Sequence, residues 1–214
     1  MTPWRLPRPP SPFPAIKPQT LKATTVLHRT HSRAFSPAQF NSCQGQPTRF
    51  APFDDAAGAC VPTLYAATTR EAAAFETIFH DIEARAAFKT VRLDVVEARS
   101  VSQIAPKRDL RLAGLFAPDL KAWKLRRTDL IDTPKSTYNL TALWAQAIHA
   151  ADASIDGLIW TSRQCDPERC LILFEDRISE SEFDVLERLE VADDAALLLE
   201  LRGFGRRAGI DLVS

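Results

Sequence analysis

The sequence predicts one α+β domain, from residue 25 to residue 214, preceded by a proline-rich arm at residues 1–24. A chain of 214 residues is long enough to bury one sizeable core, so a single domain with tails is the default expectation. Segments of strand character and of helix character follow one another without regular alternation. This irregular order favours an α+β fold over a doubly wound fold built on a parallel sheet.

The arm is predicted to be disordered or polyproline-like because prolines dominate it. Seven of the fifteen prolines lie within the first eighteen residues. Each proline fixes φ and removes a backbone donor, so neither a helix nor a sheet forms easily there. An organelle transit peptide would share the basic, acid-poor composition, but it would be an amphipathic helix, which these prolines disfavour.

The first half of the domain is predicted to contain a strand, a helix and a second strand. Residues 61–67 predict a short buried strand, and Thr68–Glu71 shows the capping-box pattern that begins a helix. Apolar residues on one face extend this helix to about four turns: Phe75, Ile78, Phe79 and Ile82. Alternation over residues 91–96 predicts a half-buried strand, and residues 97–135 are expected to form loops with short helical turns.

The second half is predicted to mix two helices with further strands. An apolar stripe predicts a helix over residues 140–151, capped by Ser136 or Thr137. A second capping box, Ser179–Glu182, predicts a helix through residues 183–189. Apolar runs predict the strands: residues 157–161, 170–174, 195–201 and 210–213.

Three glycines near the end of the chain look superficially like a dinucleotide-binding loop. The spacing of Gly203, Gly205 and Gly209 is one residue too long, and only five residues follow Gly209. No helix can follow to present its N-terminus to a pyrophosphate, so a turn between two terminal strands is the better interpretation. The sequence also contains no GxxxxGK[ST] loop, GxSxG elbow or HExxH helix.

Charge is unevenly distributed along a chain whose formal net charge is zero. Seven lysines and arginines precede Asp54, the first acidic residue. Such a basic front can contact nucleic acid or membranes, or it can supply a pocket for a polyanionic small ligand or merely a solvated surface. These charges are scattered, so we do not expect direct nucleic-acid binding. The sequence lacks a transmembrane run and the apolar core of a secretory signal, which predicts a cytoplasmic protein without membrane contact.

The cysteines and histidines do not predict a metal site. Cys165 and Cys170 lack a matching second pair, and no CxxC motif occurs. We therefore expect all four cysteines to be reduced thiols in a cytoplasmic protein. His28 and His31 are three residues apart, but no third ligand is evident.

Short motifs in a fixed order resemble the RES-domain family over about residues 25–178. They are Leu27–Thr30 (LHRT), Thr48–Pro52 (TRFAP), Leu64–Ala67 (LYAA), Ala73–Glu76 (AAFE) and Gly157–Arg163 (GLIWTSR). The family is named for an Arg, a Glu and a Ser, whose best matches are Arg49, Glu76 and Ser162. Two positions depart from the pattern, because Thr48 replaces the usual glycine and Phe50 the common tryptophan.

The resemblance implies a fold, an activity and a partner. RES proteins are similar to ADP-ribosyltransferases, with mixed, mainly antiparallel sheets and flanking helices. Members act as toxins that deplete NAD+ by phosphorolysis or hydrolysis, and some transfer ADP-ribose to a protein. NAD+ is then a substrate, with inorganic phosphate as one acceptor, and no cofactor is expected. The usual partner is an antitoxin with a helix-turn-helix domain of the Xre type. A homodimer is left open.

Glu76 suits the chemistry that the resemblance implies. The nicotinamide–ribose bond breaks through an oxocarbenium-like centre, which a fixed carboxylate stabilises more than it stabilises the ground state. Helical geometry places Glu76 at the edge of the stripe through Phe75 and Phe79, so it can face a cleft. The alternative is an exposed glutamate at a helix boundary.

The other candidate residues suit an anionic nucleotide. Arg29 and Arg49 can bind a pyrophosphate with bidentate guanidinium contacts, the alternative being surface arginines. Tyr65 can stack on nicotinamide or ribose, or it can be a core tyrosine. Ser162 can orient the ribose or the nicotinamide amide, or it can be a strand-end serine, and no histidine is placed to make it a nucleophile. We therefore expect Arg49, Glu76 and Ser162 in catalysis, with the two arginines, Tyr65 and Ser162 in binding.

Two other functions remain open. A protein mono-ADP-ribosyltransferase would use the same cleft with a side chain as the acceptor. A non-catalytic nucleotide-binding module would use a degenerate cleft, but the presence of Arg49, Tyr65, Glu76 and Ser162 argues against degeneracy.

Overall fold

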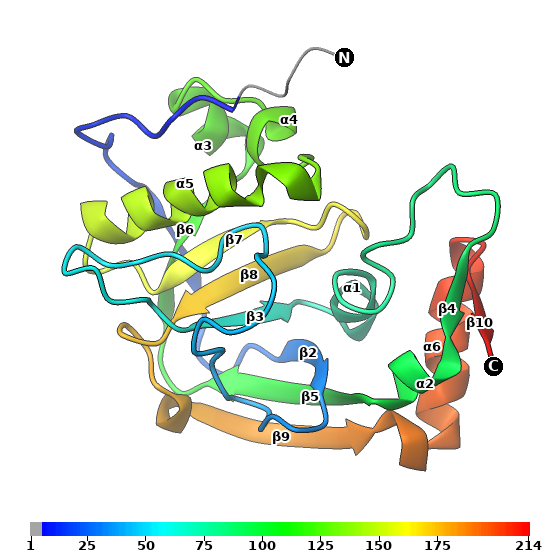
Figure 1. Ribbon diagram of the computed structural model, residues 1–214. Helices are drawn as coiled ribbons and strands as arrows, with labels where there is room; N and C mark the ends of the chain where they lie inside the picture. The colour runs from blue at the N-terminus through cyan, green and yellow to red at the C-terminus, as the bar shows by residue number, and fades with distance from the viewer. Residues whose placement is uncertain (1–5) are drawn as a thin grey trace.

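A curled eight-stranded sheet forms the centre of the computed structural model, which describes residues 6–214 (Figure 1). Its strand order is β1-β6-β7-β8-β3-β2-β5-β9. The β6–β7 pair is parallel and the other neighbours are antiparallel. The strands are β1 (Pro18–Leu21), β2 (Leu27–Ser32), β3 (Thr63–Ala67), β5 (Arg99–Pro106), β6 (Leu110–Gly114), β7 (Gly157–Thr161), β8 (Arg169–Phe174) and β9 (Phe183–Glu190). The predicted α+β class with mainly antiparallel pairing is confirmed.

Helices and a small second sheet flank this central sheet. The helices are α1 (Arg70–Phe75), α2 (Leu93–Glu97), α3 (Ala117–Ala122), α4 (Arg127–Leu130), α5 (Tyr138–Ala151) and α6 (Ala195–Arg207), with 3-10 turns η1 (Lys135–Thr137), η2 (Glu180–Glu182) and η3 (Val191–Asp193). Strands β4 (Thr90–Arg92) and β10 (Asp211–Val213) pair in parallel. Figure 1 shows α5 along one side of the sheet, with α3 and α4 beyond it and α6 at the far end.

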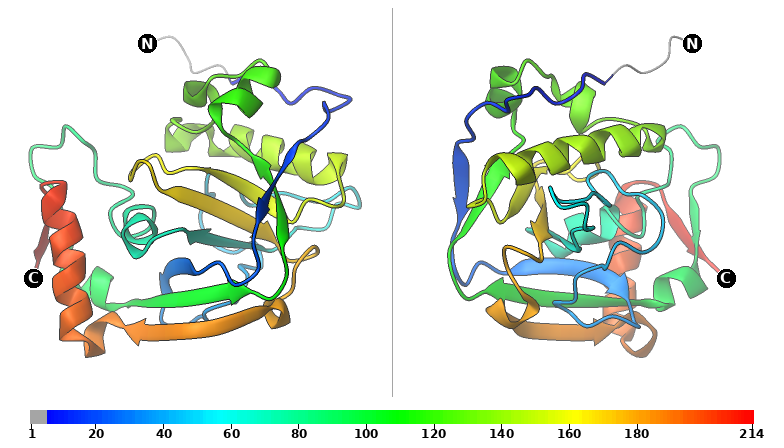
Figure 2. Two further views of the ribbon diagram at one scale, coloured as in Figure 1. Left: turned by 180° about the vertical axis from the view of Figure 1, so that it is seen from behind. Right: turned by 60° about the vertical axis from the view of Figure 1, so that its left-hand side comes forward.

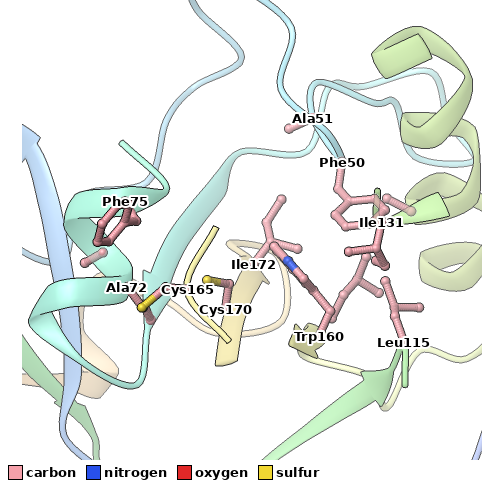
Figure 3. Close-up of a cluster of buried hydrophobic side chains, with 14 of the residues drawn as sticks. Phe50, Ala51, Ala72, Phe75, Leu115, Ile131, Trp160, Cys165, Cys170 and Ile172 are labelled. Carbon is pink, nitrogen blue, oxygen red and sulfur yellow. The ribbon is translucent and has the colours of Figure 1, made fainter. Parts of the chain in front are cut away.

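The core lies on both faces of the sheet because strand side chains alternate. Along β8, Ile172 and Phe174 belong to one buried cluster, whereas Leu171 and Leu173 belong to another. The first cluster continues through Phe50 and the aromatic and aliphatic side chains around it, part of which Figure 3 shows. Each face of the sheet is therefore closed by apolar packing.

Several predicted elements are confirmed. The strands β3, β7, β8 and β10 and the helix α5 lie where the apolar patterns placed them. The helix after β3 begins as expected, with Thr69 as its N-cap accepting from Ala72 N. It is much shorter than four turns, because α1 ends at Phe75.

Two terminal elements were assigned the wrong type. Phe183–Glu190, predicted as a helix, is strand β9, which pairs along β5. The Ser179–Glu182 capping box is present, but it closes only the turn η2. The run 195–201, predicted as a strand, begins α6, whose N-cap Asp194 accepts from Leu197 N.

The glycines and the middle segment also differ from expectation. Gly203 and Gly205 lie inside α6 rather than in a turn between strands. A Cβ on Gly205 would lie 2.9 Å from Ile210 O and 3.4 Å from the Phe79 ring, so close packing requires glycine there. Residues 97–135, predicted as loops with short helical turns, do contain the short helices α3 and α4, but they also contain the strands β5 and β6. The predicted strand over 91–96 is limited to β4, after which α2 begins.

The expectation of a disordered arm is wrong for its later part. Residues Pro18–Leu21 form β1, which pairs with β6 at the edge of the sheet, as both views of Figure 2 show. Phe13 packs edge-on against Trp123 and Trp144, at centroid distances of 5.2 and 6.0 Å. Proline removes donors but not acceptors, so Pro7 O still accepts from Trp144 Nε1 at 2.9 Å. Residues 1–5 of the predicted arm lie outside the described residues.

The expectation of four reduced thiols is wrong for two of the cysteines. Cys43 and Cys60 form a disulfide, with a Cα–Cα distance of 6.4 Å and a sequence separation of 17. Spacing alone could not reveal it, because the pairing depends on how the chain between the two cysteines folds back. Cys165 and Cys170 are free and buried.

Removing this disulfide should destabilise the fold by about 3 kcal/mol, because the cross-link restricts the unfolded chain. The double variant Cys43→Ser/Cys60→Ser would be compared with the oxidised protein by denaturant unfolding. A reducing agent should lower the stability of the parent protein and leave the double variant unchanged. Equal unfolding midpoints for parent and variant under oxidising conditions would contradict the prediction.

Among the described residues, no helix combines the length and apolar character needed to cross a bilayer. The same residues contain no group of three or more histidine, cysteine, aspartate or glutamate side chains that could hold a metal ion.

Candidate active site

A pocket of about 440 Å³ opens beside the central strands β2 and β3. The end of α1, the loop before β3, the turn η1 and the start of α5 complete its walls. The candidates that line it are Arg29, Arg49, Tyr65 and Glu76. Ser162 does not line the pocket and instead contacts Glu76 from behind.

Glu76 is held rigidly at the C-terminus of α1. Its Oε1 accepts from Ser162 Oγ at 2.6 Å and from Arg163 N at 3.0 Å. Both bonds end on the same oxygen, so among the described residues Oε2 remains available to a ligand. The carboxylate is therefore fixed on one side and open on the other, as stabilisation of a developing positive charge requires.

Ser162 is completely buried directly after β7. While donating to Glu76, its hydroxyl oxygen accepts from the backbone amides of Gln164 and Cys165, at 3.0 and 2.9 Å. Ser162 is thus a positioning residue for Glu76. The sequence predicted that it contacts ribose or nicotinamide, but its side chain does not line the pocket.

Replacing Ser162 with alanine should lower, about 100-fold, the rate constant of any reaction that depends on the Glu76 carboxylate, because that carboxylate loses its fixed orientation. The unpartnered amides should also lower the free energy of unfolding by about 2 kcal/mol. The apparent KM should change little, because Ser162 does not reach the pocket. Steady-state kinetics below the melting temperature would test this, and a raised KM with an unchanged kcat would support direct ligand binding instead.

Arg49 brings a buried cation to the same pocket. Nη1 donates to Thr133 Oγ1 at 2.7 Å, and the guanidinium carbon lies 5.2 Å from the centre of the Tyr138 ring. Nη2 is buried and has no hydrogen-bond partner among residues 6–214. Desolvation lowers the pKa of Arg49, opposed by the nearby Tyr138 and Glu76, yet an arginine stays charged at neutral pH.

Tyr65 holds the loop that carries Arg49. Its hydroxyl lies 2.9 Å from Thr48 Oγ1 and accepts from Phe50 N at 3.1 Å. Burial raises the pKa of Tyr65 to about 12, so the phenol is neutral at physiological pH. Thr48, which departs from the family's glycine, thus adds a contact that fixes this loop.

Arg29 directs its donors mainly at the protein backbone. Its guanidinium donates to Tyr65 O at 3.1 Å, to Gln39 O at 3.3 Å and to Pro37 O. Desolvation by burial lowers the pKa of Arg29 to about 10, so it remains a cation near neutral pH. Arg29 therefore joins β2, β3 and the following loop at the edge of the pocket, and most of its donors are not free for a ligand.

Sequence reasoning missed four residues at the pocket: His80, Asp81, Lys135 and Tyr138. His80 bridges Asp81 and Tyr138, at 2.7 and 3.1 Å. The sequence could have pointed to His80, because it follows the candidate Glu76 by four residues. Its partner Tyr138 comes from a helix 58 positions later, and no local pattern connects the two.

Unpartnered polar atoms gather in this pocket. Among the described residues, five buried side-chain atoms lack a hydrogen bond, and four of them belong to pocket-lining side chains. Those four are His28 Nδ1, Thr30 Oγ1, Arg49 Nη2 and Arg99 Nε. Each such group costs about 1–3 kcal/mol when neither protein, water nor a ligand satisfies it. The unpartnered buried groups of the described residues are thus concentrated in the walls of this pocket.

Comparisons with known proteins bear on the fold and the family. The fold resembles that of a chain in the crystal structure of the M. tuberculosis MbcT–MbcA toxin–antitoxin complex, with a TM-score of 0.60 and 19% sequence identity. The similarity covers 86% of this chain and 92% of that one. No curated protein matches the chain in sequence. The sequence profile described as RES domain matches residues 24–192, which include the five candidate residues and most of the described fold. The chain therefore belongs to the RES domain family.

Proposed function

We propose that this protein cleaves the nicotinamide–ribose bond of NAD+, as a toxin-type enzyme with phosphate or water as the acceptor. The observation that carries the proposal is the carboxylate of Glu76, fixed on Oε1 by Ser162 and open on Oε2 toward a pocket that also holds the buried cation Arg49. A carboxylate and a cation in one partly desolvated pocket suit a substrate that combines a positively charged leaving group with an anionic pyrophosphate.

In the proposed reaction, the C–N glycosidic bond breaks and its electron pair leaves with neutral nicotinamide. The ribose becomes oxocarbenium-like, and Glu76 opposes that positive charge without forming a bond to it. Arg49, which lines the pocket, supplies the cation for the pyrophosphate. NAD+ is thus a substrate, and the mechanism assigns no metal or cofactor.

The test is incubation of the purified protein, free of any bound partner, with NAD+. Nicotinamide should be released, and the second product should be ADP-ribose or its phosphorylated form according to whether phosphate is present. Labelled NAD+ in a lysate would mark a protein band if a side chain were the acceptor. NAD+ that stays intact with phosphate, without phosphate and in the lysate would contradict the proposal.

The structural neighbour also suggests a partner. That chain was solved within a toxin–antitoxin complex, so we propose that this protein binds a protein antitoxin, of the helix-turn-helix type that the family resemblance implies. Co-expression with a neighbouring reading frame of that type should relieve any growth defect and yield a complex that no longer consumes NAD+.

A further inference from the structure

A continuous chain of hydrogen bonds runs along one wall of the pocket. Lys135 Nζ lies 2.5 Å from Asp81 Oδ1, and the same oxygen lies 2.7 Å from His80 Nδ1. On the other side of the imidazole ring, Nε2 lies 3.1 Å from the hydroxyl of Tyr138. These residues come from the loop after α1, from η1 and from the first residue of α5, and all of them line the pocket.

The charges decide which groups donate and which accept in these hydrogen bonds. Burial raises the pKa of Asp81, but hydrogen bonds from Lys135 and His80 outweigh it and hold the pKa below its ordinary value. The Asp81 carboxylate is therefore ionised and must accept, so His80 carries its proton on Nδ1. Nε2 then has a free electron pair, and the Tyr138 hydroxyl donates to it.

The segment 162–164 contacts both this series of hydrogen-bonded side chains and the candidate carboxylate of Glu76. Gln164 Nε2 donates to His80 O at 3.2 Å, while Ser162 and Arg163 N donate to Glu76. The Tyr138 ring also lies against the Arg49 guanidinium. His80 and Glu76 thus share one supporting segment and line the same pocket.

We propose that Tyr138, His80 and Asp81 form a proton relay that activates water as the acceptor, an inference that rests on the NAD+-cleaving function proposed above. As the water oxygen bonds to the anomeric carbon, one water proton passes to the Tyr138 oxygen. The tyrosine's own proton passes to His80 Nε2, and Asp81 stabilises the resulting imidazolium. The products are ADP-ribose and nicotinamide, and His80 later returns the proton to solvent.

Comparing water with phosphate as the acceptor separates the effect of the relay from other effects on the rate. Water must lose a proton to become the hydroxyl of ADP-ribose. The hydrogen phosphate dianion already offers an anionic oxygen and needs no base. The ratio of hydrolysis to phosphorolysis therefore reports on the relay, whereas damage to Glu76, Arg49 or the fold lowers both rates together.

The experiment measures both products for the full-length protein and for two variants, His80→Gln and Tyr138→Phe. The phenylalanine keeps the ring beneath Arg49 and removes only the hydroxyl. We expect the hydrolysis-to-phosphorolysis ratio to fall about 100-fold in each variant, the usual contribution of a positioned base. His149→Gln is the matched control, since His149 is a buried histidine paired with Asp176 at 2.9 Å and lies outside the pocket lining. Its ratio should stay at the parent value.

The Asp81→Asn variant adds a second readout. The charged or titratable groups facing His80 are Asp81, Lys135 and Tyr138, and those acting on Tyr138 are Arg49, Arg163, Lys135 and Glu76. In this variant the hydrolysis-to-phosphorolysis ratio should also fall, because the imidazolium formed during hydrolysis loses its partner.

The outcomes separate the two proposals. Unchanged NAD+ with the parent protein under every condition contradicts the proposed function. Cleavage that yields no ADP-ribose without phosphate overturns the relay alone. So does an equal loss of both products, or an unchanged ratio, in His80→Gln and Tyr138→Phe.

Discussion

Replacing Glu76 with glutamine is expected to lower the rate of NAD+ cleavage about 1000-fold, because the pocket loses the negative charge that opposes the oxocarbenium-like centre. Glutamine keeps the shape of the side chain and an oxygen that can accept from Ser162 and Arg163 N. The fold should therefore survive, with little change in the melting temperature. Nicotinamide release under saturating NAD+ measures the effect.

Glu83→Gln is the control for this variant. Glu83 is exposed in the loop after α1 and does not line the pocket, so its loss of charge should leave the rate unchanged. If Glu76→Gln retained more than about a tenth of the parent rate, Glu76 would not carry the charge stabilisation assigned to it.

Replacing Phe50 with alanine should lower the free energy of unfolding by about 4 kcal/mol, the usual cost of a large cavity in a packed core. Phe50 is completely buried and packs edge-on against Trp160 at a centroid distance of 5.0 Å. Figure 3 shows its ring beside Ile131 and near Trp160. Denaturant unfolding followed by tryptophan fluorescence would measure the change.

Phe88→Ala is the matched comparison for Phe50→Ala. Phe88 is 88% exposed, so its truncation should change stability by less than about 0.5 kcal/mol. Similar losses at the two positions would show that the packing around Phe50 does not dominate stability. Because Phe50 follows Arg49, the destabilised variant should also show a raised KM for NAD+ at temperatures where it remains folded.

The elements predictable from sequence were those whose local pattern is unambiguous. The strands β7 and β8 are only five and six residues long and lie in the middle of the sheet, and short apolar runs of that length suit a buried strand. The stripe of α5 likewise has one clear period. The α+β class followed from the irregular order of these elements.

The errors occurred where long-range contacts overrode local signals. The spacing of Phe183, Leu186 and Leu189 suits a helix, but β5 offers that segment a full set of backbone partners. Consecutive leucines in α6 resemble a buried strand, yet only Leu197 and Leu201 are buried and Leu199 is 65% exposed. Local pattern cannot reveal which of these partners the folded chain provides.

The candidate site was predictable only in part for the same reason. Glu76 and Arg49 could be proposed because family motifs and charge chemistry point to them directly. The positioning role of Ser162 could not, since it depends on a contact across 86 positions of sequence. The hydrogen-bonded series that joins Lys135, through Asp81 and His80, to Tyr138 was missed, because its members meet only after η1 and α5 fold over the end of α1.

The support of α1 comes from a part of the chain that is made much later. Arg70 pairs with Glu200 and Glu71 with Arg207, across 130 and 136 positions, and α6 then leads into β10. A nascent chain on the ribosome therefore holds the glutamate segment long before α6 exists to brace it. The segment that carries Glu76 therefore gains these two ion pairs only once α6 has been made, so its full stability is reached at a late stage of synthesis.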